Sequence, residues 1–244
     1  RFSLPIVPDA CKYYEWFMIV LSLISIVYVG FIALAQTDMK RLIAYSSVSH
    51  MGFVTLGLFL ALVIIQRTAD VQDAYMCIEG AMTQMISHAF GSGAMFLGFG
   101  MLYQQVHSRL IKDYGGVAKT MPYFAAFYLL FAMSNIGLPG TSGFVGEFMI
   151  ILSAFKASFW VATISALSLI VGASYTLWMF KRVFYGKVEN NTVAQLNDIS
   201  GIDLFNFLLL AGGVLFVGLY PNALVQLFHA STDHLLQLSI MTKL

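Results

Sequence analysis

The chain has 244 residues, of which 59% are hydrophobic and 10% are charged, and its mean hydropathy is +0.80. A soluble domain has about 45–50% apolar and about 25% charged residues, so this composition excludes an ordinary soluble domain and indicates a chain surrounded by lipid. The net charge of +1 and the scattered basic residues give no indication of nucleic acid as a partner.

Long apolar windows occur six times along the chain. A bilayer core about 30 Å thick requires about 20 apolar residues, and lipid offers the backbone no hydrogen-bond partner, so each window is predicted to be a transmembrane helix. The six windows are Glu15–Thr37, Lys40–Ile65, Met76–Val106, Met121–Phe155, Phe159–Phe180 and Asp203–Phe228. The predicted fold class is therefore an all-α, polytopic membrane helix bundle. We expect a solvated connector at Gly186–Ile202 and a short amphipathic segment after His229.

The fourth window is too long for one straight helix, and four helix-breaking residues lie near its middle: Gly137, Pro139, Gly140 and Gly143. Pro139 lacks an amide hydrogen and clashes with the preceding turn, while the glycines allow the chain to bend back into line. This window is predicted to be a broken helix. Irregular backbone at membrane depth is tolerated only beside protein or a water-filled cavity, and transporters build ion sites there.

Lysine and arginine residues are unevenly distributed between the two sides of the predicted bundle. One side has Lys40, Arg41, Arg109, Lys112, Lys119, Lys181, Arg182 and Lys187, and the other has Arg1, Lys12, Arg67, Lys156 and Lys243. The positive-inside rule therefore places the loops after the first, third and fifth windows in the cytoplasm or mitochondrial matrix. The C-terminus then faces the periplasm or the intermembrane space.

Glu147 is the first of three ionisable residues that the sequence places inside the membrane, where such residues are costly and usually functional. It lies four residues after Gly143, the last helix-breaking residue of the predicted break. Burial raises a carboxyl pKa by up to about 3–5 units, which corresponds to roughly 4–7 kcal/mol in favour of the neutral form. A helix N-terminus favours the anion by at most about 2 kcal/mol, so burial is expected to be the larger effect unless water or a cation is close. A carboxyl poised between its two states suits proton transfer. The alternative is a glutamate that caps the second half-helix without titrating.

His88 is the second such residue, about 18 Å into the third window at 1.5 Å per residue. Small and polar residues surround it at helical spacing, as expected of a helix face that lines a hydrated path or a close helix contact. These residues are Gly80, Gln84, Ser87, Gly91 and Ser92. An imidazole has a reference pKa of about 6.5 and exchanges protons readily. The alternative is a neutral histidine hydrogen-bonded to a neighbouring helix.

His50, in the second window, is the third. Hydroxyl-bearing residues precede it and suggest a wet helix face: Tyr45, Ser46, Ser47 and Ser49. Lys40 lies at the membrane boundary, where a snorkelling lysine or one paired with Asp38 is the alternative to a role in proton transfer. Glu79 lies near the opposite boundary, and His107, His229 and His234 lie at predicted helix ends, where an interfacial role is expected.

Three stretches containing these residues closely resemble the subunit 4/chain M family of respiratory NADH:quinone oxidoreductase (complex I). They are Ala-Gln-Thr-Asp-Met-Lys-Arg-Leu-Ile-Ala-Tyr-Ser-Ser-Val-Ser-His-Met-Gly at 35–52, Gln-Met-Ile-Ser-His-Ala at 84–89, and Gly-Leu-Pro-Gly-Thr-Ser-Gly-Phe-Val-Gly-Glu-Phe at 137–148. The likeness extends over the whole chain. It implies that residues 1–244 are the C-terminal half of an antiporter-like membrane domain, the last six of fourteen helices.

By this resemblance Glu147 matches the protonatable residue of the family's broken twelfth helix, His88 the histidine of the eleventh and His50 that of the tenth. The family's upstream carboxylate and lysines would precede Arg1, so another chain or segment is expected to supply the N-terminal half. We expect Arg1 to pack against a lysine-bearing helix of that half. The other expected partners are lipids and the remaining membrane-arm subunits.

The resemblance implies a proton-translocating, non-redox subunit that leads protons toward the intermembrane space or periplasm. NADH, FMN, iron–sulfur clusters and ubiquinone are expected on other subunits, since Cys11 and Cys77 have no metal-ligand spacing. The alternatives are a subunit of a multi-subunit cation/proton antiporter or membrane-bound hydrogenase, and a membrane scaffold. The expected location is the mitochondrial inner membrane, with the bacterial plasma membrane as the alternative.

Overall fold

The computed structural model describes residues 3–68 and 71–240, and within these ranges the chain is helical apart from its loops and one isolated β-bridge between Asp38 and Leu110. The long helices are α3 (Glu15–Leu34), α4 (Met39–Thr68), α5 (Val71–Val106), α7 (Pro122–Ile136), α8 (Ser142–Ala157), α9 (Phe159–Phe184), α11 (Gly201–Leu219) and α12 (Pro221–Ile240). The short ones are α1 (Ser3–Ile6), α2 (Pro8–Tyr13), η1 (Ile111–Asp113), α6 (Val117–Thr120) and α10 (Asn191–Ala194). The predicted all-α class is confirmed.

The first, second, third and fifth predicted windows correspond to α3, α4, α5 and α9. These four helices and α11 are long and apolar enough to span a membrane. The fourth window is two helices, α7 and α8, and the predicted break between them is confirmed. Our expectation for Arg1 lies outside the described residues.

The sixth predicted window was wrong in its extent. Helix α11 ends at Leu219, and Pro221 begins a separate helix, α12, that runs to Ile240. Proline fits the first turn of a helix but cannot continue one, and it drives the preceding residue out of helical geometry. Tyr220 accordingly has φ −126° and ψ 54°. The terminal helix is thus longer than the expected segment after His229 and starts earlier.

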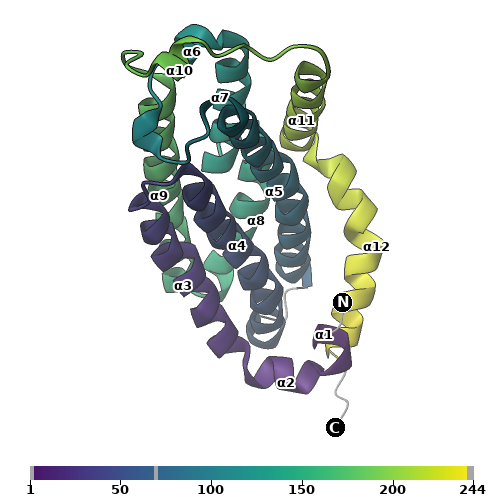
Figure 1. Cartoon of the computed structure of the whole chain (residues 1–244). Helices are drawn as coiled ribbons and strands as arrows, with labels where there is room; N and C mark the ends of the chain where they lie inside the picture. Colours follow the sequence, from purple (N-terminus) through teal and green to yellow (C-terminus); the bar gives the residue numbers. More distant parts are fainter. Residues whose placement is uncertain (1–2, 69–70, 241–244) are drawn as a thin grey trace.

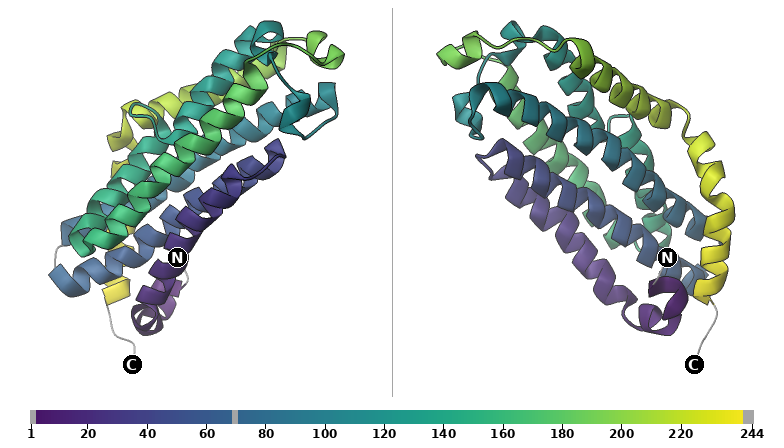
Figure 2. Two further views of the ribbon diagram at one scale, coloured as in Figure 1. Left: turned by 90° about the vertical axis from the view of Figure 1, so that its left-hand side faces the viewer. Right: turned by 45° about the vertical axis from the view of Figure 1, so that its right-hand side comes forward.

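The spanning helices run roughly along one axis, and α12 crosses the end of the bundle at which α4 ends and α5 begins (Figures 1 and 2). Helix α5 has a central position, because it packs on α4, α7, α8, α11 and α12. Helix α3 packs on α4 and α9. Side chains of α5 can therefore reach several neighbours at once, which matters for the site described below.

The loops at the opposite end of the bundle are tied to the helices by specific hydrogen bonds. Met39 N donates to Arg109 O at 2.9 Å, which joins the start of α4 to the loop after α5. The carboxylate of Asp198 accepts from Tyr123 N at 2.8 Å and from Phe124 N at 3.0 Å, and so caps α7. The stretch expected to be a solvated connector thus satisfies free N–H groups at the start of a helix.

Glycine permits a very close approach of α5 and α8. A Cβ atom built on Gly146 would lie 2.7 Å from the backbone nitrogen and from the side-chain oxygen of Gln84. Small residues at helix crossings let two backbones meet in lipid, where the hydrophobic effect does not drive association. Because Glu147 follows Gly146 directly, this contact fixes the distance between Glu147 and α5.

A methyl group at Gly146 should therefore separate α5 from α8. We expect Gly146→Ala to lower the stability of the purified protein by about 1–3 kcal/mol, the usual cost of overpacking a close contact. Gly212→Ala is the matched control, because a Cβ at Gly212 meets nothing within 4 Å. Thermal unfolding in one lipid or detergent measures both variants, and equal melting temperatures would contradict the close contact.

Candidate functional site

The helix break is built by glycines with left-handed backbone angles. Gly137 ends α7 with φ +80°, and Gly140 has φ +91°, a region that residues with a Cβ rarely adopt. Leu138 N donates to Met133 O at 3.0 Å and Gly137 N to Ser134 O at 3.1 Å. These two bonds satisfy the last carbonyl groups of α7, as in a Schellman motif. The break therefore ends α7 without leaving those polar backbone atoms unpaired in lipid.

The second half-helix begins close against the first. A Cβ atom on Gly143 would collide with the carbonyl oxygen of Ser134, so only glycine allows this approach. The hydroxyl groups of Ser134 and Ser142 lie 3.1 Å apart. Glu147 then lies in the second turn of α8, beyond the first turn in which a helix N-terminus acts strongly. The hydrogen bonds of its side chain go to His50 and Gln84 on other helices, so it does not cap α8.

Glu147 forms a buried pair with His50 of α4. Glu147 Oε1 lies 2.6 Å from His50 Nδ1 and accepts from Gln84 Nε2 at 3.0 Å. Glu147 is 3% exposed and His50 is 7% exposed. Removing one partner of such a pair costs about 3–5 kcal/mol, because the remaining group stays buried without compensation. Three helices, α4, α5 and α8, are thus joined at one carboxylate.

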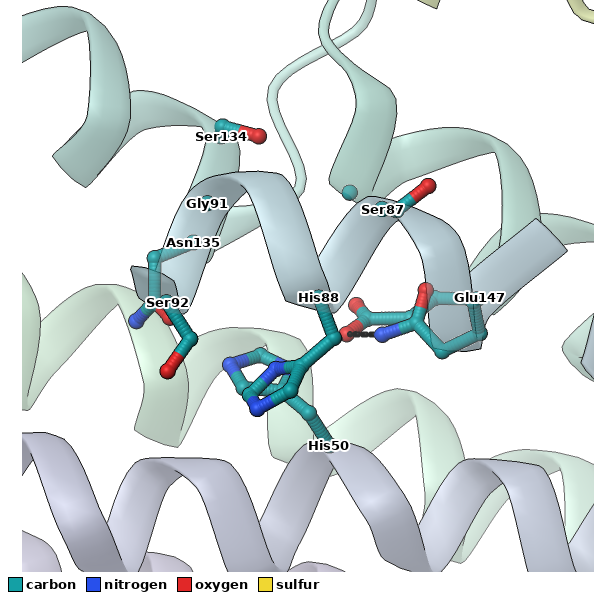
Figure 3. Close-up of a pocket in the computed structure, with 10 residues that line it drawn as sticks. His50, Ser87, His88, Gly91, Ser92, Ser134, Asn135 and Glu147 are labelled. Carbon is teal, nitrogen blue, oxygen red and sulfur yellow. Dashed lines mark hydrogen bonds and ion pairs between the residues drawn. The ribbon is translucent and has the colours of Figure 1, made fainter. Parts of the chain in front are cut away.

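His88 lies beside this pair, on α5. The ring centroids of His50 and His88 are 5.6 Å apart. No direct hydrogen bond joins them, because His50 Nδ1 pairs with Glu147 and His50 Nε2 has no partner in the protein, but the rings are close enough for one bridging water. Figure 3 shows the two rings side by side, with Glu147 on one side and Ser92 and Asn135 on the other. A small cavity connects these groups. Its lining residues are His50, Gln84, Ser87, His88, Gly91, Ser92, Ser134, Asn135, Gly143 and Glu147.

The cavity has the size and polarity of a water site. The space in which the centre of a water molecule can lie has a volume of about 10 Å³, which is near the minimum for one buried water. Three buried atoms of its lining residues have no hydrogen-bond partner in the protein: His50 Nε2, Gln84 Oε1 and Ser87 Oγ. Buried polar atoms are costly when unpaired. A water in this cavity would satisfy such atoms and link the two imidazoles.

A second small cavity lies on the other side of the pair, toward α9. It is lined by His50 and Glu147 together with Tyr175, Ser168 and Gly172, among others. Asn135 lines both cavities and donates from Nδ2 to Thr176 Oγ1 at 3.0 Å. The His50–Glu147 pair therefore has a small cavity with polar side chains on each of two sides, and apolar side chains do not enclose it completely.

The sequence-predicted residues do not all meet. His50, His88, Glu147 and Gly143 line one cavity, and Gly137 and Gly140 supply the turn beside it. Lys40 is exposed in the first turn of α4, about 15 Å along the helix from His50 at 1.5 Å per residue. Asp38 accepts from Arg41 N at 3.0 Å, and no ion pair of Lys40 occurs among the described residues. A role for Lys40 in proton transfer stays a prediction.

Asn135 and Tyr175 belong to this site but were not singled out from the sequence. Both are buried, at 7% and 1% exposure. The available signal for Asn135 was its place in an apolar helix just before the break, since buried amides in lipid need partners. Tyr175 had no comparable signal, because tyrosines are common throughout the chain.

The chain resembles known membrane proteins over nearly all of its length. Residues 1–172 match the family model described as NADH:quinone oxidoreductase/Mrp antiporter, TM. The chain is 40% identical to NADH-ubiquinone oxidoreductase chain 4 of Marchantia polymorpha and 41% identical to NADH-quinone oxidoreductase subunit M of Rhodobacter capsulatus. Both alignments cover 97% of this chain. It covers 46% and 44% of these relatives, so it spans about half of their length.

A solved structure has the same fold. A chain of respiratory complex I from Thermus thermophilus with bound NADH superposes with a TM-score of 0.86 at 30% identity, over 98% of this chain and 48% of that one. The predicted antiporter-like helix arrangement is therefore confirmed. Within residues 3–68 and 71–240, no group of three or more His, Cys, Asp or Glu side chains is arranged to hold a metal ion.

The buried pair predicts strong coupling between His50 and Glu147. We expect His50→Leu and Glu147→Leu each to lower the stability by about 3–5 kcal/mol, and the double variant to be more stable than additivity predicts by about 0.5–3 kcal/mol. Unfolding of the purified protein measures this cycle. The pair of Asp73 and Lys156 is the control: its atoms lie 3.6 Å apart and the lysine side chain is 57% exposed, so its coupling should be about 0–1 kcal/mol. Additive effects at His50 and Glu147 would contradict the pairing.

Proposed function

Because the chain belongs to the NADH:quinone oxidoreductase/Mrp antiporter transmembrane family, we propose that it is part of a proton-translocating membrane subunit of an NADH:quinone oxidoreductase. The observation that carries this proposal is the buried pair of His50 and Glu147 beside His88, at a helix break and between two small polar cavities. Relatives at 40% and 41% identity carry the names of such oxidoreductase subunits. A membrane protein keeps costly ionisable groups at its centre when they serve transport.

The geometry suits stepwise proton transfer. When Glu147 is ionised, His50 Nδ1–H donates to it, and when Glu147 is protonated it can donate to an unprotonated Nδ1; the 2.6 Å separation permits both. His50 Nε2, unpaired within the protein, can then exchange a proton with His88 through a water. Glu147 and His88 return to their starting states after passing a proton on, whereas His50 is left with its proton on the other ring nitrogen and regains its first tautomer by ring rotation or by exchange with water. The path therefore needs only a driving force that alters the charge at one end.

The chain supplies one half-channel in this proposal. The carboxylate and lysines that the resemblance expects upstream belong to the other half of the subunit, and a chain or segment that precedes these helices would supply them. NADH, FMN, iron–sulfur clusters and ubiquinone would be bound by other subunits. Their electron transfer would supply the energy, while this chain's own residues move protons and carry out no redox step.

The membrane is the chain's setting, as its apolar spanning helices show. Relatives come from a plant and from a bacterium, so both the mitochondrial inner membrane and a bacterial plasma membrane fit, and we propose the former. The runner-up function, a subunit of a multi-subunit cation/proton antiporter, has support in the family description. Copurification with NADH-oxidising subunits tests the first function, and sodium-dependent pH changes without such subunits would favour the second.

Glu147→Gln should preserve assembly but reduce the protons translocated per NADH oxidised, because the amide keeps the shape and loses the titration. Proton uptake or release by sealed vesicles that contain the assembled complex, measured beside NADH oxidation, tests this. Glu189→Gln is the control, since Glu189 is an exposed loop carboxylate. An unchanged ratio for Glu147→Gln with intact assembly would rule out a relay at this carboxyl.

His88→Leu should slow proton flux through this path by about 10²-fold, the lower end of the range for groups that act in general acid–base steps. Leucine fills the space of the imidazole and leaves the buried pair in place, so the stability should change little. His234→Leu is the control, because His234 is exposed on α12. If pumping by His88→Leu vesicles matched that of His234→Leu vesicles, His88 would have no part in the relay.

A further inference from the structure

A second histidine–glutamate pair lies at the end of the bundle that α12 crosses. His229 Nδ1 of α12 and Glu79 Oε1 of α5 are 2.8 Å apart. The Glu79 side chain is 9% exposed, whereas that of His229 is 62% exposed. The pair therefore has one member inside the bundle and one at its surface. The sequence indicated an interfacial place for both residues but gave no reason to bring them together.

This pair lines a large cavity that also has apolar walls. The cavity has a volume of about 680 Å³ and is lined by Val71, Gln72, Asp73, Tyr75, Met76, Glu79, Met149 and His229. Further polar contacts surround it: the Tyr75 hydroxyl donates to Asp233, and Lys156 lies 3.6 Å from Asp73. A water occupies about 30 Å³ in the liquid, so the cavity has room for many. Glu79 is thus in contact with a space that water can fill.

Two buried hydroxyl groups lie on α5 between this cavity and the central site. Glu79, Thr83 and Ser87 recur every four residues on α5 and therefore lie along one helix face, about 6 Å apart at each step. Thr83 is 0% exposed and Ser87 is 2% exposed. The hydroxyl oxygens of both residues have no hydrogen-bond partner in the protein. Ser87 lines the central cavity, so the row begins at the site of Glu147 and ends at Glu79.

Unpaired hydroxyls at this depth require an explanation. A threonine hydroxyl within a helix commonly donates to the backbone carbonyl four residues earlier, as Thr163 Oγ1 does to Phe159 O at 2.8 Å. Thr83 and Ser87 lack even this local bond, which leaves two buried groups able to accept and donate at once. Such hydroxyls are suited to pass a proton between waters on either side.

We propose that Glu79 and His229 form the outer terminus of the proton path, joined to the central site by Ser87 and Thr83. This inference rests on the proposed proton translocation. A proton that leaves the central site passes through water and the two hydroxyls, each of which gains one proton and gives up another. The Glu79 carboxylate accepts it and returns to its ionised form by giving it to His229 or to water in the cavity. Glu79 and His229 are titratable terminal residues, and Thr83 and Ser87 are hydroxyl relays.

The competing explanation is that the pair only fastens α12 to α5. Removing Glu79 would then weaken the attachment of α12, but removing the hydroxyl of Thr83 would change nothing in transport, because Thr83 forms no bond to α12 that its loss could break. The two explanations therefore differ most at Thr83. Glu79→Asp separates them further, since it keeps a titratable carboxyl but shortens its reach to His229.

The experiment uses the assembled complex in sealed vesicles and measures the initial rate of proton translocation. We expect Thr83→Val, which preserves shape, and Glu79→Gln each to lower this rate to the level of Glu147→Gln. Residues in one series path are not additive, so Thr83→Val combined with Glu147→Gln should be no slower than Glu147→Gln alone. Glu79→Asp should recover at least half of the lost rate. The matched controls, Thr163→Val and Glu189→Gln, should pump as the unaltered protein does.

The outcomes distinguish this inference from the function on which it rests. Normal rates for Thr83→Val and Glu79→Gln, with a reduced rate for Glu147→Gln, would overturn the outer terminus and leave the proposed function standing. A normal rate for Glu147→Gln would overturn the proposed function itself. If Glu79→Gln fails to assemble, Thr83→Val and Ser87→Ala decide alone: reduced rates support the path, and normal rates of both variants reject it.

Discussion

The hydrogen-bonded pair of Glu147 and His50 is the interaction around which the central part of this bundle is arranged. A carboxyl group in the membrane interior is costly unless it is paired, and this one is 3% exposed. Its partner comes from α4, and Gln84 of α5 donates a further hydrogen bond at 3.0 Å. Three helices must therefore keep their relative positions for one side chain to be tolerated. Their packing and the proposed chemistry depend on the same contact.

The break between α7 and α8 makes this arrangement possible. Gly137 turns the chain with a left-handed backbone, and Gly143 and Gly146 allow α8 to approach Ser134 on one side and Gln84 on the other. Any Cβ at these close contacts would push α8 outward and move Glu147 away from His50. The glycines are thus not merely flexible points. They bring polar groups into contact that bulkier residues would hold apart.

Helix α5 connects the two ends of the proposed path. One part of its surface carries His88 and Gln84 toward the central cavity, and the row from Ser87 through Thr83 leads to Glu79 beneath α12. A transmembrane helix can carry such a row only if lipid does not reach it, because unpaired hydroxyls in hydrocarbon are costly. The neighbouring helices α8, α11 and α12 shield α5, so this row faces protein and cavities.

The sequence by itself determined the membrane setting, the first five apolar windows and the break at Gly137–Gly143, and it singled out Glu147, His88 and His50 as candidates for proton transfer. These features follow from local composition: apolar length, proline and glycine chemistry, and the cost of burying charge. Tertiary structure alone decided which groups meet. His50 and Glu147 are 97 residues apart in the chain, and helical periodicity defines a face without saying which helix it contacts. The partner of Glu79, the place of Tyr175 and the separation of Lys40 from the central site were likewise decided by packing.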